Sequence, residues 1–406
     1  MTTMTMPKPA KTDERLPDRA SQGLVETLPG WTYNNAEFFA LEKEHLFLGN
    51  WQLVCHVSEL GNPGAYATLN LLGERAMVVR GDDGQIRAFY NVCRHRAAAV
   101  VKGRNGSCKE ALRCPYHGWT YALDGRLKAV PGEASFPGLE KPEFGLKPLP
   151  IEIWSGFVFV KFRAGGPSVA ERMAPFAEEL KAYRIEEMVP VGELWTGEPG
   201  VDWKNIMDNY LEGYHVPVGH PGLYRMFGSH YEAEVHPGDV ARHIHWLRDN
   251  PSEAWSERHY QTILPAIDHL PEERRRAWAY YTLQPNLAFD LYPDMIDFFH
   301  VVPIGPGKAK IRGRAYGLPD APRALKAARW LNWRVNTQVQ KEDDELIRSV
   351  QAGLGSESYS TGILSEKEIG VRQLHDLVRR ALPVARLPEP PEPGSMASLN
   401  ETLASV

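Results

Sequence analysis

Apolar and polar residues alternate in short runs between about residues 52 and 163. Turn sequences rich in Gly, Asn, Asp and Pro separate these runs, such as Asp82-Asp83-Gly84 and Asp124-Gly125. Alternation with a period of two, interrupted by such turns, is typical of a small antiparallel β domain. The clearest predicted strands cover residues 76–79, 86–90 and 151–160.

A different pattern begins after Gly165-Gly166-Pro167, which marks a domain boundary. Helical periods continue to about residue 185, and further helices are predicted over 202–216 and 321–352. Extended segments are predicted at 278–284, 287–292, 296–303 and 309–317. A β domain that is followed by an antiparallel sheet with helices is an α+β fold.

These patterns divide the chain into four parts. Residues 1–45 form an N-terminal arm and helix that we expect to pack on the larger domain, with the first 24 or so residues loose. The β domain covers 46–164 and the second domain covers 165–385. The tail, 386–406, is rich in Pro, so we expect it to lack regular packing or to lie as an arm on a neighbour.

Composition and charge narrow the function classes. A formal net charge of -5 argues against a nucleic-acid-binding protein, whose domains usually carry a basic face. We find no apolar run long enough to span a membrane and no apolar N-terminal stretch typical of a secretory signal. Four cysteines do not make a disulfide scaffold in a chain of 406 residues. We therefore expect a reduced, cytoplasmic protein, in which cysteines near histidines often bind metal.

Two Cys-His pairs form the first candidate site. Eighteen residues separate Cys93 and His95 from Cys114 and His117. Two thiolates and two imidazoles on turns of a β domain are the ligand set of a Rieske [2Fe-2S] cluster, in which the imidazoles raise the reduction potential. Zinc is the alternative, but zinc sites usually pair Cys with Cys and His with His at wider spacings. The spacing therefore predicts a Rieske cluster held by these four residues.

The residues around the second pair are also similar to those of Rieske proteins. Respiratory members carry two extra cysteines that link the cluster loops, whereas this chain has Ala98 and Tyr116 at those positions. The resemblance is thus to the ferredoxin and oxygenase branch, which works at lower potential. Cys55 and Cys108 have no assigned role, and we interpret them as buried or idle thiols.

A second cluster of ligand-type residues lies in the predicted helix 202–216 and just after it. Spacings of four and three place Asp208, Glu212 and His215 on one helical stripe. Pro217 is expected to end the helix, and a turn there would bring His220 back towards the stripe. Two histidines so placed need one carboxylate to complete a facial triad for ferrous iron, which leaves positions open to O2.

The long predicted helix 321–352 offers that carboxylate. Glu342 and Asp343 fall at the two margins of its apolar face, while Asp344 points away. A carboxylate beside a buried face needs a partner, and a metal ion would provide one. Periodicity does not choose between Glu342 and Asp343.

Together the two sites resemble the terminal oxygenase α subunits of the Rieske non-haem iron oxygenases, and the resemblance covers nearly the whole chain. It implies a helix-grip-like catalytic domain, with an antiparallel sheet and a long C-terminal helix, after the Rieske domain. The stretch 339–362 is similar to that C-terminal helix. In this register the iron-binding acid is Asp343, so the implied metal ligands are His215, His220 and Asp343.

The resemblance also implies an assembly. Family members form head-to-tail trimers in which each cluster reduces the iron of its neighbour through a bridging carboxylate. That bridge is usually an aspartate three residues before the first histidine, and here the position is Glu212. The departure resembles the branch that oxidises quaternary amines, which includes carnitine, choline and betaine oxygenases. Asp208 is the competing bridge, and Asn205 is a further candidate for a catalytic role.

The implied reaction uses O2 and a small organic substrate. Electrons would come from a separate NAD(P)H-dependent reductase, because this chain has no Gly-x-Gly-x-x-Gly nucleotide loop. Hydroxylation of an N-methyl carbon would release formaldehyde and give N-demethylation. Ring hydroxylation or O-demethylation of an aromatic acid is the alternative reaction.

The predicted catalytic half is rich in aromatic residues. They could bind a quaternary ammonium through cation–π attraction, line a flat pocket for an aromatic acid, or fill the core. These residues are Tyr210, Tyr214, Trp246, Trp255, Trp278, Phe289, Tyr292 and Phe298. The non-enzyme alternative is a Rieske electron-transfer protein, which would be about a quarter of this length and would lack the second site. A catalytically idle metal scaffold would show the cluster's colour without consuming oxygen.

Overall fold

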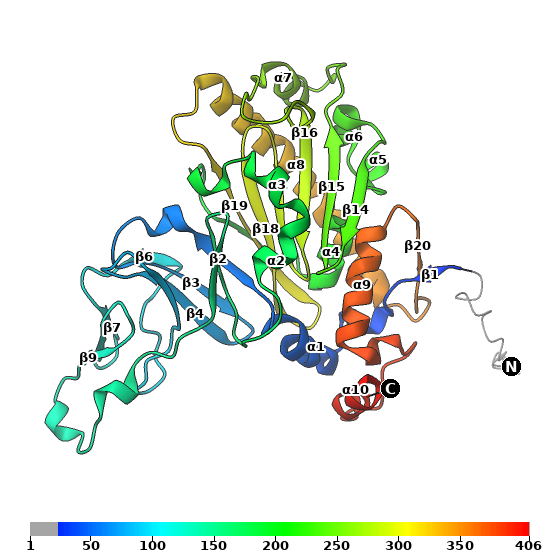
Figure 1. Ribbon diagram of the computed structural model, residues 1–406. Helices are drawn as coiled ribbons and strands as arrows, with labels where there is room; N and C mark the ends of the chain where they lie inside the picture. Colours follow the sequence, from blue (N-terminus) through cyan, green and yellow to red (C-terminus); the bar gives the residue numbers. More distant parts are fainter. Residues whose placement is uncertain (1–22, 406) are drawn as a thin grey trace, which may run out of the picture.

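The structure is a computed structural model that describes residues 23–405 of the chain. A β domain lies beside a larger domain that is built around one antiparallel sheet (Figure 1). The α+β prediction is confirmed. The loose segment predicted before residue 24 falls almost entirely outside the described residues. Among the described residues, no helix is long and apolar enough to cross a membrane.

The β domain consists of three small antiparallel sheets, with strand orders β5-β4-β3-β6, β7-β8-β9 and β10-β11-β2. Its strands are β2 (Gln52–His56), β3 (Ala65–Leu71), β4 (Glu74–Arg80), β5 (Ile86–Tyr90), β6 (Asn105–Ser107), β7 (Leu112–Arg113), β8 (Thr120–Tyr121), β9 (Leu127–Ala129), β10 (Ile151–Trp154) and β11 (Phe157–Val160). Short helical turns connect them: η4 (Val57–Leu60), η5 (Glu133–Ser135) and η6 (Lys141–Phe144). The predicted strands 76–79 and 86–90 fall inside β4 and β5.

The predicted single strand 151–160 is instead a hairpin of β10 and β11. The chain turns at Ser155 and Gly156, which both have positive φ. A side chain at Gly156 would collide with the ring of His56, so only glycine fits there. The hydrophobicity pattern did not reveal this turn, because β11 is buried on both faces and so reads as one apolar run. It connects the cores of the two domains.

The larger domain is built on an eight-stranded sheet in the order β12-β19-β18-β17-β16-β15-β14, with β13 also paired to β19. Its strands are β12 (Val189–Pro190), β13 (Trp195–Gly197), β14 (Glu232–His236), β15 (Val240–Trp246), β16 (Ala277–Leu283), β17 (Leu287–Leu291), β18 (Ile296–Gly305) and β19 (Lys308–Gly317). The four extended segments predicted from the sequence correspond to β16 to β19. The register of each pair confirms the prediction that these strands form an antiparallel sheet.

Helices cover both faces of this sheet. Alternate residues of β16 point to opposite sides: Ala279 and Tyr281 pack in one core with α2 and α3, and Trp278 packs in another with α6, α7 and α8. The helices are α2 (Val169–Met173), α3 (Ala177–Lys181), α4 (Trp203–Tyr210), α5 (Val216–Gly219), α6 (Pro221–Phe227), α7 (Trp255–Ile263), α8 (Arg323–Leu354) and α9 (Ile369–Ala381). Short turns are η7 (Ala174–Phe176), η8 (Ile185–Glu187) and η9 (Glu272–Arg274). The long helix predicted over 321–352 is α8.

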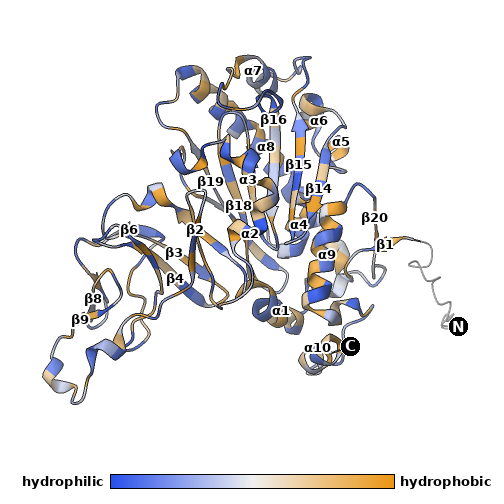
Figure 2. Ribbon diagram, in the orientation of Figure 1, coloured by the Kyte–Doolittle hydropathy of each residue, from blue (hydrophilic) through white to orange (hydrophobic). Residues whose placement is uncertain are grey.

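Both ends of the described chain pack on the larger domain. β1 (Val25–Glu26) pairs with β20 (Ile363–Leu364), and α9 buries Val371, Leu374 and Val378 at helical spacing, so that hydrophobic and hydrophilic residues alternate along it (Figure 2). The remaining N-terminal elements are η2 (Gly30–Tyr33), α1 (Ala36–Glu42) and η3 (Lys43–Phe47).

The C-terminal tail differs from the expectation. Residues after 382 form η10 (Pro383–Arg386) and α10 (Met396–Ala404), and α10 packs against α1 of the same chain. Met396 is buried, and Asn400 accepts a hydrogen bond from the backbone of Val384. Proline prevents regular structure only between these two elements, and the apolar residues beyond the prolines fold back onto the protein.

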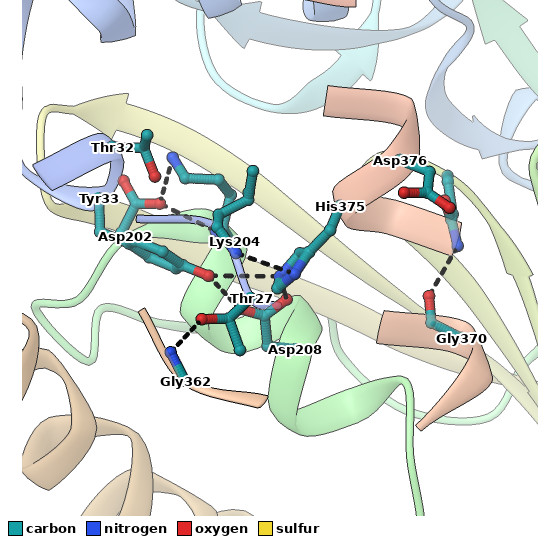
Figure 3. Close-up of polar contacts among 12 residues, drawn as sticks. Thr27, Thr32, Tyr33, Asp202, Lys204, Asp208, Gly362, Gly370, His375 and Asp376 are labelled. Carbon is teal, nitrogen blue, oxygen red and sulfur yellow. Dashed lines mark hydrogen bonds and ion pairs between the residues drawn. The ribbon is translucent and has the colours of Figure 1, made fainter. Parts of the chain in front are cut away.

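Buried polar residues fix α4 where the N-terminal segment meets it (Figure 3). Asp202 caps the helix by accepting a hydrogen bond from the backbone of Lys204. The Lys204 ammonium is completely buried and lies 2.6 Å from Glu42 and 2.8 Å from Asp202. Charges taken out of water need such close partners. The position of α4 therefore depends on residues more than 150 positions apart in the sequence.

Candidate metal centres and active-site cavity

The two Cys-His pairs lie on two loops with the same backbone pattern. In each loop the cysteine amide donates to the carbonyl five residues on (Ala98 or Trp119), and the amide four residues on (Ala97 or Gly118) donates back to the cysteine carbonyl. The residue that closes each loop, Ala97 or Gly118, has positive φ. Two equivalent loops thus present one thiol and one imidazole each.

The two loops bring their imidazoles together and their thiols together. The two cysteines are buried, His95 is partly buried and His117 is exposed, and the imidazole ring centres are 4.6 Å apart. His95 stacks on Trp119 with ring centres 5.0 Å apart, which fixes its orientation. Its buried Nδ1 has no hydrogen-bond partner among the described residues. A buried, unpartnered ring nitrogen next to a second imidazole, with two buried thiols on the same loops, fits a metal-binding group.

Tyr121 contributes to this site although the sequence pattern did not single it out. Its hydroxyl lies 3.2 Å from the Cys93 sulfur and accepts a hydrogen bond of 3.0 Å from the backbone of Arg94, so its own proton points to the sulfur. Burial raises the pKa of the Cys93 thiol, and the Tyr121 hydrogen bond opposes that rise. The hydroxyl therefore favours the thiolate that a cluster requires.

The second site does not sit on one helical stripe. α4 ends at Tyr210, so Glu212 and His215 follow it on a turn and only Asp208 is on the helix. Pro217 does not end a helix; it lies in the first turn of α5, where its missing amide is not needed. The short α5 then carries the chain to His220, which is what brings the two histidines together.

Each histidine of this site is held by a carboxylate through its Nδ1 atom. Glu212 hydrogen-bonds the Nδ1 of His215, and Glu342 lies 2.8 Å from the Nδ1 of His220. Carboxylates at these positions assign the protons to Nδ1 and leave both Nε2 atoms free to bind a metal. The two Nε2 atoms face each other at 3.0 Å. Two ligands at right angles around one ion, each about 2.1 Å from it, would be separated by about that distance.

Asp343 completes the cluster. Its Oδ1 lies 2.9 Å from the Nε2 of His220 and 3.7 Å from that of His215, and within residues 23–405 it accepts no hydrogen bond. The three ligand atoms lie within 4.8 Å of one another. Burial lowers the pKa of His220, but Asp343 and Glu342 more than offset it, so the net pKa is raised. These residues fit a 2-His-1-carboxylate iron site, with Glu342 supporting His220.

The other two candidate residues lie elsewhere. Asp208 accepts hydrogen bonds from Tyr33 at 2.6 Å and from His375 at 3.0 Å, at the junction with the N-terminal segment (Figure 3). The backbone amide of Leu28 donates to the other ring nitrogen of His375, so the imidazole proton points to Asp208. Asn205 donates its amide to the carbonyl of Ile347 on α8, which ties the two helices together. Neither residue lines the cavity described next.

A cavity of about 960 Å³ opens onto the three candidate iron ligands. His243 and His245 also line it, and burial lowers their pKa values to about 4 and about 3, so both are neutral at physiological pH. Eight aromatic side chains form much of its wall: Trp195, Tyr210, Phe227, Tyr280, Tyr292, Phe299, Trp330 and Trp333.

Of the aromatic residues selected from the sequence, only Tyr210 and Tyr292 are in this wall. Trp278, Phe289 and Phe298 are core residues. Two acids that were not predicted from the sequence, Asp290 and Asp297, line the cavity from β17 and β18. A signal for them existed, since an acidic residue inside an apolar strand is unusual and needs a partner.

Family models match both parts of the chain. Residues 50–147 match the Rieske [2Fe-2S] domain, and residues 188–383 match the catalytic domain of the ring-hydroxylating α subunit. The chain is 30% identical over 351 residues to the carnitine monooxygenase oxygenase subunit of Acinetobacter pittii, which covers 85% of this chain and 90% of that protein. It is 27% identical over 368 residues to the chloroplastic choline monooxygenase of Spinacia oleracea, covering 88% and 79% of the two proteins.

Solved structures agree. The quaternary ammonium Rieske monooxygenase CntA in complex with L-carnitine superimposes with a TM-score of 0.74 and 26% identity, over 91% of this chain and 99% of that chain. Naphthalene 1,2-dioxygenase from Rhodococcus has the same fold, with a TM-score of 0.73 and 20% identity over 89% and 95%. The chain belongs to the Rieske non-haem iron oxygenases. It is an oxygenase α subunit whose cofactors are a Rieske [2Fe-2S] cluster and a mononuclear iron.

Proposed function

We propose that this oxygenase hydroxylates an N-methyl group of a small quaternary ammonium or betaine-like compound. The observation that carries the proposal is the aromatic wall of a cavity that opens onto His215, His220 and Asp343. Ring faces attract an ammonium cation, and they do so more strongly when water is excluded. The relatives named for carnitine and choline oxidation support the same substrate class.

The reaction balances with a separate reductase. O2, two electrons and two protons convert the N-methyl group to N-hydroxymethyl and water. The C–N bond then breaks, giving a tertiary amine, formaldehyde and a proton. The electrons would come from NAD(P)H through that reductase.

We assign the site residues as follows. His215, His220 and Asp343 hold the iron, which supplies the activation of O2 when bound. Glu342 and Glu212 hold the Nδ1 protons of the two histidines and so keep each Nε2 aimed at the metal. Cys93, His95, Cys114 and His117 hold the cluster.

Glu212 is also our candidate for the bridge that carries electrons to the iron. Its carboxylate contacts a candidate iron ligand and lines the cavity, whereas Asp208 is occupied by Tyr33 and His375. Glu212→Gln should keep iron bound and slow the single-turnover oxidation of the reduced cluster. Asp208→Asn is the matched control and should leave that rate near the wild-type value. An unchanged rate in Glu212→Gln, with a slow Asp208→Asn, would assign the bridge to Asp208.

We further propose a homotrimer in which each cluster serves the iron of a neighbour. In Figure 1 the small sheet β7–β9, beside the cluster loops, lies at the outer end of the β domain, away from α5 and α6. The solved structure of a quaternary ammonium Rieske monooxygenase gives insight into inter-subunit electron transfer in that protein. The expected cytoplasmic location belongs to the same proposal, supported by four unpaired cysteines. Light scattering of the purified protein tests the trimer, and a monomeric mass at full activity would contradict it.

The substrate class is tested with purified enzyme and a surrogate reductase. Ammonium compounds and aromatic acids are compared, and formaldehyde and O2 uptake are measured for each. We expect formaldehyde in proportion to O2 uptake from at least one N-methylated ammonium compound, and none from the Asp343→Ala variant. Ring-hydroxylated products from the aromatic acids, with no formaldehyde from any ammonium compound, would refute the proposal.

A further inference from the structure

Two carboxyl groups meet inside the cavity wall. Asp290 of β17 and Asp297 of β18 are register partners in the sheet, and both line the cavity. Burial and the neighbouring Asp290 carboxyl together raise the pKa of Asp297 well above its usual value. Like charges this close do not both ionise near neutral pH, so the pair shares a proton and carries a single negative charge.

Within the described part of the chain, no cationic side chain compensates this charge. Among residues 23–405, neither Asp290 nor Asp297 takes part in an ion pair. Arg329 lines the same cavity, but its guanidinium donates to the backbone carbonyls of Asp294 and Leu318, at 2.7 and 3.4 Å. A buried negative charge without a cationic partner is costly to the folded protein. The pair is therefore a place where an external cation would gain binding energy.

Three tyrosines surround the pair and supply only neutral contacts. The Tyr210 hydroxyl donates to Asp290, and the Tyr292 hydroxyl lies 3.4 Å from its other oxygen. The ring of Tyr280 lies 6.1 Å from that of Tyr210 and 6.4 Å from that of Tyr292, near perpendicular to both. Burial raises the pKa of each of these hydroxyls well above its usual value, so all three stay protonated.

We propose that the Asp290–Asp297 carboxyl pair, with the tyrosines around it, is the subsite that receives the cationic nitrogen of the substrate. This inference rests on the proposed function and deepens it, since it names the group that discriminates a cation from a neutral molecule of the same shape. The rings supply cation–π attraction and the pair supplies the opposite charge. A permanently charged ammonium suits the subsite because it needs no hydrogen-bond acceptor.

The subsite should respond to pH. Burial raises the pKa of Asp290 to about 6, so the pair loses its negative charge as pH falls through that value. Cation affinity should then fall, by up to about tenfold per pH unit, and binding should release protons. Other groups facing this region are the three tyrosines, neutral His243, and Asp294, whose pKa burial also raises to about 6. Asp294 is unchanged in every variant below, so its contribution cancels between them.

The variants separate charge from shape. Asp290→Asn combined with Asp297→Asn removes all negative charge from the pair, and Asn at 290 can still accept the Tyr210 hydrogen bond. Asp297→Asn alone is the matched control, because its amide imitates a protonated Asp297 and leaves Asp290 charged. Retained cluster absorption shows that the Rieske domain of a variant has folded, and retained iron at the mononuclear site shows the same for the catalytic domain.

Binding is measured by calorimetry with the oxidised holoenzyme and no reductant, so that no turnover occurs. The probes are choline and its neutral carbon isostere, 3,3-dimethylbutan-1-ol. We expect the double variant to lose choline affinity on the order of a hundredfold, to keep its affinity for the neutral alcohol, and to lose proton release near pH 6. The control should bind choline within a few-fold of wild type.

Equal choline affinity in wild type and double variant, or no choline binding by wild type at millimolar concentration, would overturn the subsite. Loss of both probes in the double variant would also count against it, since that would indicate a structural role. The proposed function fails separately. The proposed N-methyl hydroxylation is wrong if no ammonium compound yields formaldehyde, whatever the carboxyl pair binds. If formaldehyde is formed while the double variant still binds choline, the proposed function holds and only the subsite is wrong.

Discussion

Replacing Lys204 by Met should destabilise the protein strongly, and the loss should depend on pH. The ammonium is fully buried, 2.6 Å from Glu42 and 2.8 Å from Asp202, and those carboxylates are 1% and 2% exposed. It also lies 5.1 Å from the ring centre of Trp203. Methionine preserves the contact with the ring but leaves two buried acids without a cation. Breaking a buried ion pair from one side costs about 3 to 5 kcal/mol.

The pH dependence follows from Glu42. Burial raises the pKa of its carboxyl from 4.5 to about 7, although Lys204 lowers it. A raised folded-state pKa contributes stability that is present below pH 4.5 and is lost as pH rises through about 7. Without Lys204 the Glu42 pKa rises further, so the acid is neutral at pH 6 and costs less there. We therefore expect a larger loss at pH 8 than at pH 6.

Scanning calorimetry at the two pH values measures this effect. At roughly 2 °C per kcal/mol, the expected fall in Tm at pH 8 is on the order of 6 to 10 °C. Adding Glu42→Gln to the Lys204→Met variant should restore part of the Tm at pH 8 and reduce the pH dependence, because Asp202 is then the one remaining acid of the pair. A Tm within 1 °C or so of wild type at pH 8, or an equal loss at both pH values, would refute the reasoning.

The remaining predictions concern the two metal sites. Asp343→Ala should reduce the metal content from about three to about two iron atoms per chain, with the visible spectrum of the cluster unchanged, and should abolish product formation; full iron content would place the metal elsewhere. Glu342→Ala should weaken iron binding by about 10- to 100-fold in chelator competition, because the Nδ1 of His220 loses its partner; wild-type affinity would show that the contact is incidental. Tyr121→Phe should lower the reduction potential of the cluster by roughly 40 mV, since the loss of one hydrogen bond to the Cys93 sulfur is worth about 1 kcal/mol; electrochemical titration checks this, and an unchanged or higher potential contradicts it.

Local patterns were sufficient for much of this protein. The strands β16 to β19 and the helix α8 were predicted close to their observed bounds because each has a strong period of its own. The Cys-His pairs were recognisable because the spacing of the ligand types within each loop restricts the metal they can hold.

Local patterns failed where distant segments meet. A continuous helix over 202–216 was predicted, but α4 ends at Tyr210. Glu212 hydrogen-bonds His215, whereas Asp208 hydrogen-bonds Tyr33 and His375. Helical periodicity has no information about those partners. Similarly, α10 forms because α1 offers it an apolar surface, which the prolines before it do not reveal.

The sequence by itself thus determined which residue types are available for two metal centres and which strands and helices carry them. Only the tertiary structure decided that Glu342 serves His220 while Asp343 faces both histidines, and that Asp290 and Asp297 share one cavity wall. The physical reason is that ligand chemistry and periodicity are properties of neighbouring residues, whereas the partner of a buried charge is chosen by how the whole chain packs.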